Sequence, residues 1–105
     1  MADGLQGSAS LAAGTPTLIA TAPNAGSIFN VWIVNNSTAP TTLTVWASSA
    51  LVAGSLTNSQ LIVAGRTLLP FAEYEKNAVC LSAGESIWVQ DSAGTCDVCV
   101  RGFVG

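Results

Sequence analysis

The feature that most constrains the fold is a succession of short apolar runs, none of which keeps the period of an amphipathic helix. Runs rich in Val, Ile, Thr and Trp alternate with clusters of Gly, Pro, Asn and Ser about every eight to twelve residues. The runs favour strands and the clusters favour turns. We therefore expect about seven to eight short strands in an antiparallel β-sandwich, jelly-roll or immunoglobulin-like, although a partly open barrel also fits.

The clearest strand pair is predicted near the end of the sequence. Residues 86–90 (SIWVQ) and 95–101 (TCDVCVR) favour strands, and the DSAG segment between them favours a tight turn. We expect these two strands to form a hairpin. Side chains alternate along a strand, so the second run has one apolar face and one face with Asp97, Cys99 and Arg101.

Several earlier segments also predict strands. Residues 15–22 suit an edge strand, and residues 27–35 (SIFNVWIVN), apolar on both faces, suit a central strand that is covered on both sides or meets another chain. Residues 41–47 are expected to pair with 27–35, because the link between them is short. Residues 48–59 are predicted to form a surface loop, and residues 72–77 (AEYEKN) an exposed charged turn.

The length of 105 residues is enough for one domain with a single core. Residues 1–10 (MADGLQGSAS) are polar, and we expect a flexible N-terminal arm, free or ordered on a neighbouring subunit, before a single domain at 11–105. Residues 1–10 lack the basic and apolar regions of a secretion signal, and the sequence has no apolar run of about eighteen residues. These observations predict a protein made in the cytoplasm, without a membrane partner.

Charged residues make up 9% of the chain, which has a net charge of −3. The three basic residues, Arg66, Lys76 and Arg101, are scattered, so they cannot form the basic stripe that binds nucleic acid. A surface with so few charges is weakly protected against association. This composition suits a subunit of an assembly better than a free monomer.

Candidates for chemistry are few. The chain has no histidine, which removes the commonest general base and zinc ligand. Glu73 and Glu75 would project to the same side of a strand, the minimum geometry for a carboxylate pair, but a solvated charged loop is the simpler reading. We expect no catalytic residue, no metal and no cofactor, and therefore no enzyme.

Cys96 and Cys99 have the spacing of a redox or metal-binding pair. Residues three apart on a strand point to opposite faces, so these two thiols cannot share a metal or form a relaxed disulfide. We expect all three cysteines to pack as small apolar side chains. The alternatives are a disulfide from Cys80 to Cys96 or Cys99, and a zinc site that also needs an Asp or Glu ligand.

Three tryptophans, Trp32, Trp46 and Trp88, lie in predicted strands. Large aromatic side chains are usually buried in a core or at an interface. Exposed on a sheet face, they could instead stack on sugar rings. A carbohydrate-binding module that contacts a host cell surface is therefore the alternative function, with a glycan as its partner.

Three segments together resemble small virion structural proteins of tailed bacteriophages: residues 11–48, residues 81–94 and the closing VCVRGFVG. The likeness lies in an Ala-Gly-Thr entry, an apolar strand that ends in Asn, a Thr-rich strand, the LSAGESIWV segment and the final Val-x-Val-x-Gly. This resemblance implies a non-enzymatic β-sandwich protein of the virion, in head decoration (cement), tail or baseplate. It also implies that the partners are major capsid or tail subunits and that the chain forms a homo-oligomer. The family has no active site, so the resemblance assigns no catalytic residues to this chain.

The candidate subunit-interface residues are large and apolar. Each prediction depends on the side chain pointing away from the core. They are Phe29, Trp32, Trp46 and Phe103. Phe29 and Trp32 point to opposite faces of one strand, so at most one of them is expected to contribute.

Overall fold

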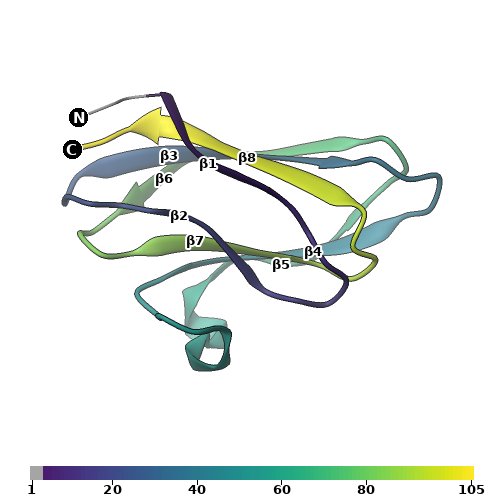
Figure 1. Cartoon of the computed structure of the whole chain (residues 1–105), viewed down its shortest axis with the longest axis horizontal. Helices are drawn as coiled ribbons and strands as arrows, with labels where there is room; N and C mark the ends of the chain where they lie inside the picture. Colours follow the sequence, from purple (N-terminus) through teal and green to yellow (C-terminus); the bar gives the residue numbers. More distant parts are fainter. Residues whose placement is uncertain (1–3) are drawn as a thin grey trace.

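The computed structural model describes residues 4–105 as eight strands in two four-stranded antiparallel sheets (Figure 1). Sheet A has the strand order β1-β8-β3-β6, and sheet B has the order β2-β7-β4-β5. The strands are β1 (Gly4–Ser10), β2 (Thr17–Thr21), β3 (Ser27–Asn35), β4 (Thr41–Ser48), β5 (Leu61–Leu68), β6 (Glu73–Leu81), β7 (Ser86–Asp91) and β8 (Cys96–Phe103). The predicted antiparallel β-sandwich is confirmed.

Each strand of the first half pairs with a counterpart in the second half: β1 with β8, β2 with β7, β3 with β6 and β4 with β5. This is the jelly-roll arrangement of two Greek keys. Successive strands lie in opposite sheets, except β4 and β5, which are neighbours in sheet B. The β4–β5 connection, residues 49–60, is the predicted loop and contains two 3-10 turns, η1 (Ala53–Ser55) and η2 (Asn58–Gln60).

Two strand pairs that were predicted from short connections are wrong. β7 and β8 form no hairpin, because β7 belongs to sheet B and β8 to sheet A, and β3 and β4 are separated in the same way. The turn between each pair carries the chain from one sheet to the other. A tight polar turn reverses the chain direction, but it does not determine whether the two strands hydrogen-bond side by side or pack face to face.

The core lies between the sheets and is built from alternate residues of the strands. In β3, Phe29, Val31 and Ile33 are fully buried, whereas Asn30 and Trp32 point outward. β3 is central in sheet A, as predicted, and its outer face is uncovered within this chain. The largest fully buried apolar side chains are Phe29, Ile33, Leu43, Ile87, Val31, Val45, Val89 and Val100.

Residues 4–10 are not a flexible arm, because they form the edge strand β1 and pair with β8. Gly7 lies where β1 passes close to β2, and a Cβ atom there would be 2.0 Å from the carbonyl oxygen of Ile19. The sequence did not predict this strand, because polar residues and glycine are uncommon in strands. The glycine is required by the close approach of β1 to the backbone of β2, which is a tertiary contact. Residues 1–3 of the expected arm lie outside the described residues.

The turn between β7 and β8 is organised by the buried carboxylate of Asp91. Its Oδ1 accepts a hydrogen bond from the amide of Ala93 (3.0 Å), and its Oδ2 accepts from the amides of Thr95 (2.7 Å) and Cys96 (2.8 Å). The hydroxyl of Thr41 also donates to Oδ1. The carboxylate therefore satisfies backbone N–H groups that have no strand partner where the chain crosses between the sheets.

A second buried polar side chain, Asn35, connects three turns at the same end of the sandwich. Its side-chain NH2 donates to the carbonyl oxygens of Ala39 (2.9 Å), Leu68 (3.3 Å) and Leu69 (3.2 Å). Its Oδ1 accepts from the hydroxyl of Thr95 at 2.8 Å. Asn35 thus joins the end of β3 to the end of β5 and to the residue that precedes β8, by hydrogen bonds that hydrophobic packing alone would not specify.

Asp91 makes the stability of the chain depend on pH. Burial by itself would raise the pKa of this carboxyl, but hydrogen bonds from Thr41, Ala93, Cys96 and Thr95 outweigh burial and lower the pKa below its ordinary value of 3.8. The unfolded chain therefore takes up the proton at a higher pH than the folded chain. This stabilisation is complete above about pH 4 and is lost as the pH falls through the lowered pKa. We expect the free energy of unfolding, measured with urea, to fall across this window.

The variant Asp91→Asn tests the assignment. It removes the charge and turns one oxygen into an NH2 group that faces backbone donors, so we expect a cost of about 2–4 kcal/mol at pH 7 and a flatter pH dependence. Asp97→Asn, at an exposed position of β8, is the matched control and should cost less than about 1 kcal/mol. An Asp91→Asn variant with the pH dependence of the wild-type chain would contradict this role.

Candidate functional site

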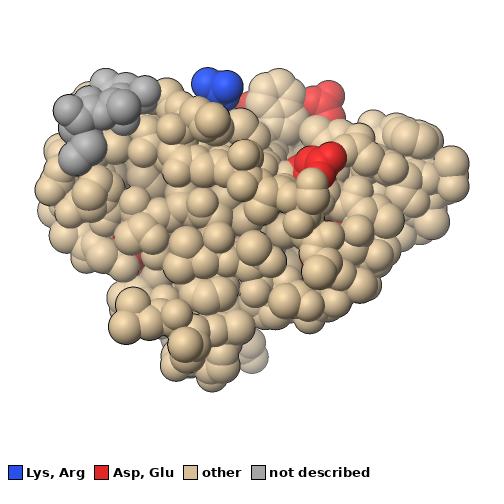
Figure 2. Space-filling model, in the orientation of Figure 1, with Lys and Arg blue, Asp and Glu red and all other residues tan. Residues whose placement is uncertain are grey.

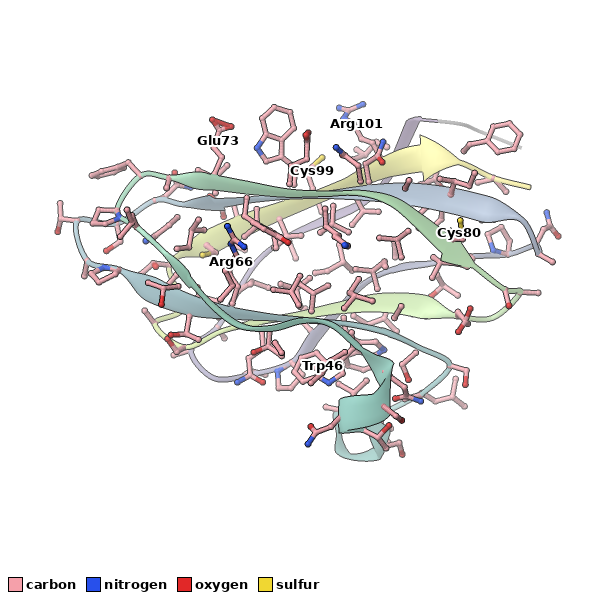
Figure 3. The ribbon with its side chains drawn as sticks, turned by 180° about the vertical axis from the view of Figure 1, so that it is seen from behind. Trp46, Arg66, Glu73, Cys80, Cys99 and Arg101 are labelled. Carbon is pink, nitrogen blue, oxygen red and sulfur yellow. The ribbon has the colours of Figure 1, made fainter. Side chains whose placement is uncertain are left out.

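Charged and aromatic side chains gather on the outer face of sheet A, the side turned away from the core. Side chains that project from it include Trp32, Glu73, Glu75, Asp97, Arg101 and Phe103. Figure 2 shows charged atoms along the sheet A side of the molecule, whereas most of the remaining visible surface is uncharged. In Figure 3, Glu73, Cys99 and Arg101 project from sheet A, while Trp46 lies on the opposite side, beyond sheet B.

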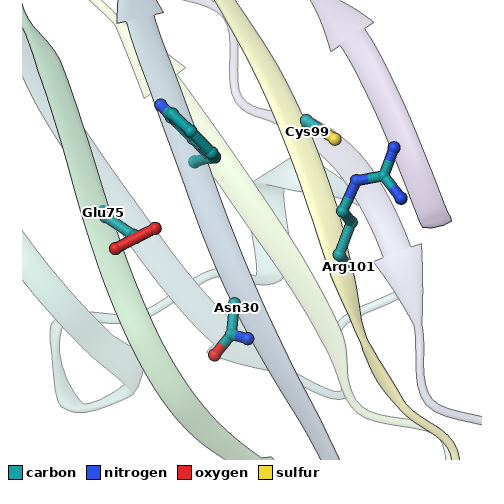
Figure 4. Close-up of a pocket in the computed structure, with 5 residues that line it drawn as sticks. Asn30, Glu75, Cys99 and Arg101 are labelled. Atoms are coloured by element: carbon teal, nitrogen blue, oxygen red, sulfur yellow. The ribbon is translucent and has the colours of Figure 1, made fainter. Parts of the chain in front are cut away.

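Strand register brings five residues of this face together. Trp32, on the middle strand β3, lies between Glu75 of β6 and Cys99 of β8. Asn30, two residues earlier on β3, is opposite Arg101 of β8. These five side chains line a hollow of about 200 Å³, with Glu75 on one side of β3 and Cys99 and Arg101 on the other (Figure 4).

Two carboxylates flank the indole of Trp32. Its Nε1–H donates to Oε2 of Glu73 at 2.9 Å, which fixes the orientation of the ring while 47% of the residue stays exposed. Oε1 of Glu75 accepts from the side-chain amide of Asn77 at 3.3 Å. Both glutamates belong to β6, so the expectation of an exposed turn at residues 72–77 is wrong, and their projection to one face follows from strand alternation.

The structure separates the four candidate interface residues. Phe29 is fully buried in the core, and a side chain with no exposed surface cannot contact another subunit, which corrects the expectation for this residue. Trp32 and Phe103, which is 54% exposed, share the outer face of sheet A. Trp46 is half-buried on the outer face of sheet B, where its register partner is the buried Trp88.

The three cysteines have different surroundings, and all are free thiols. Cys96 points into the core, whereas Cys99 points outward and is half-buried, as strand alternation predicts. Burial, with a further contribution from the negative charge of Asp91, raises the pKa of the Cys96 thiol to about 12. Cys80 is exposed on β6, opposite Ile28.

Sequence reasoning missed Asn30 and Arg101 as members of a site. Alternation already placed Arg101 on the same face as Cys99, and Asn30 is two residues from Trp32 on one strand. That signal gives the face of each strand. Which residues of β3, β6 and β8 lie side by side depends on strand order and register, and the short turns suggested a different strand order.

Residues 4–105 contain no group of three or more His, Cys, Asp or Glu side chains that could hold a metal ion. Within the same described part of the chain, no helix is long and apolar enough to cross a membrane. Comparison with protein-family models, with curated proteins and with solved structures found no match for this chain. The resemblance to tailed-phage virion proteins stays a prediction from the sequence segments quoted above.

Thiol reactivity should follow these surroundings. On the native chain at pH 8, we expect iodoacetamide to modify Cys80 rapidly, Cys99 more slowly, and Cys96 only after unfolding, because a buried thiol with a pKa of about 12 carries almost no thiolate. Peptide mass spectrometry over a time course measures the three rates, and the urea-unfolded chain is the control. Modification of native Cys96 as fast as Cys80 would contradict the inward orientation.

Proposed function

We propose that the chain is a non-enzymatic structural subunit of a tailed-phage virion, in head decoration, tail or baseplate, and that it assembles with other virion proteins and with copies of itself. The observation that carries this proposal is the spread of exposed apolar side chains over separate parts of the surface. A protein that binds one small ligand needs one site, whereas a subunit of an assembly has neighbours on several sides.

The exposed apolar side chains outside the Trp32 hollow occupy three regions in particular. These are the β4–β5 connection with Leu51 (89% exposed) and Val52, the β5–β6 turn with Leu69 and Phe71 (both 64%), and the terminal end of the outer face of sheet A with Leu5, Ile28 and Phe103. The first two regions lie at opposite ends of β5. The scarcity of charge leaves these regions poorly protected in a free monomer.

The jelly-roll fold alone does not select this function, because it occurs in capsid proteins and in lectins. The β5–β6 turn supplies a more specific argument. Phe71 follows Pro70 in this turn and has a φ of +53°. A positive φ at this position of a turn favours glycine. An exposed aromatic side chain at a strained backbone position does not stabilise the fold. Its presence there supports a role in contact with a partner.

The copy number of the chain in purified virions tests the proposal. We expect quantitative mass spectrometry to find it at a fixed ratio to the major shell protein. A near-stoichiometric ratio would assign it to head decoration, and a ratio equivalent to one ring or a few fibres would assign it to the tail or baseplate. Absence from purified particles would overturn the virion role.

A substitution in the β5–β6 turn separates assembly from stability. Phe71→Gly removes the exposed ring and relieves the positive φ, so we expect equal stability or a gain of up to about 1 kcal/mol, together with reduced incorporation into particles. Phe71→Leu keeps an apolar side chain and should retain more incorporation. Full incorporation of Phe71→Gly would exclude this turn as a contact.

A further inference from the structure

The hollow around Trp32 has the chemistry of a ligand site and not of an apolar contact. One wall is the indole ring, whose orientation is fixed by the hydrogen bond to Glu73. The other walls carry an amide, a carboxylate and a guanidinium, from Asn30, Glu75 and Arg101. Small-molecule sites typically combine apolar surface with a few convergent polar groups in this way.

Each of the three polar side chains has unused hydrogen-bonding capacity. Asn30 accepts from the amide of Ala78 at 2.8 Å, and its NH2 group has no hydrogen-bond acceptor within residues 4–105. Glu75 accepts one hydrogen bond from Asn77 through Oε1, which leaves Oε2 free to accept. The described part of the chain provides no hydrogen-bond or ion-pair partner for the Arg101 guanidinium, which has five N–H donors.

We propose that this hollow binds one neutral pyranose ring of a glycan. The C–H face of the sugar lies on the indole of Trp32, where flat apolar surface meets the weakly polar ring face. Neighbouring hydroxyls donate to Glu75 and accept from Asn30 and Arg101. Trp32 thereby has a ligand-binding role in place of the subunit contact expected from the sequence.

Size and charge select the ligand class. A hollow of about 200 Å³ is smaller than a typical drug-sized pocket, so it holds a single ring and not an oligosaccharide. Glu73, Glu75 and Arg101 give the site a net negative charge, which disfavours uronic and sialic acids. A ligand this small binds weakly, with a Kd of about millimolar.

The inference goes beyond the structural role and does not depend on it. Weak single sites become effective when many copies contact one surface, because each bound copy raises the effective concentration of the next. A subunit repeated in a particle supplies such copies. The test below uses the isolated chain, so its failure would leave the structural role untouched.

The three indole N–H signals of the 15N-labelled full chain provide the readout, assigned with Trp→Phe variants. We expect methyl glycosides of glucose, galactose or mannose, titrated to about 100 mM, to shift the Trp32 signal saturably and to leave Trp46 and Trp88 unchanged. Methyl glucuronide should bind at least tenfold more weakly. Trp32→Ala, Glu75→Gln and Arg101→Gln should each weaken binding at least tenfold, and Trp46→Phe should not change it.

Thermal unfolding of each variant confirms that the fold is retained, which is expected because these side chains lie on the outer face of sheet A. Three results would overturn the proposal: no saturable shift at Trp32 with any neutral glycoside, equal shifts at all three indoles, or wild-type binding by both Glu75→Gln and Arg101→Gln. Tighter binding of the glucuronide would overturn the assignment to neutral sugars.

Discussion

The jelly roll depends on turns that take the chain from one sheet to the other, and the buried Asp91 carboxylate shows what such a turn requires. All but one of the connections in this chain cross between the sheets, and the backbone of a crossing turn has no neighbouring strand to supply acceptors. Asp91 accepts three backbone N–H groups and the hydroxyl of Thr41 on β4. One ionised side chain thereby fixes both the turn and its position relative to another strand of sheet B.

The fold also explains why the outer face of sheet A carries the candidate site. The core takes alternate side chains of β3, β6 and β8, so the remaining ones point to solvent as rows across three strands. A flat face of this kind places residues distant in sequence, such as Asn30 and Arg101, next to each other without a loop. The exposed apolar groups proposed for assembly lie mainly at strand ends and connections, so one small domain has room for both roles.

Much of the local structure could be predicted from the sequence. The apolar run between two turn segments predicted the bounds of β3 as they are found, and the proline near the start of residues 15–22 indicated the edge position of β2. Period-two alternation predicted the opposite orientations of Cys96 and Cys99. Strand pairing could not be predicted, because a short polar turn is compatible with a hairpin and with a crossing between sheets. The first strand was missed because most of its residues are polar or glycine, and Gly7 is required by a close contact with another strand.

The members of the site were hard to predict for the same reason, because strand pairing could not be predicted from the sequence. Trp32 was identified from its own side chain, whereas Asn30 and Glu75 belong to the hollow only through the register of β3 with its two neighbours. The pairing of β1 with β8 carries a consequence for biosynthesis. A ribosome releases Gly4–Ser10 long before Cys96–Phe103, so until β8 has been synthesised β1 has no partner in its sheet and β3 lacks one of its two. Sheet A can therefore close only after β8 has left the exit tunnel, and until then the backbone of β1 and one edge of β3 are unpaired.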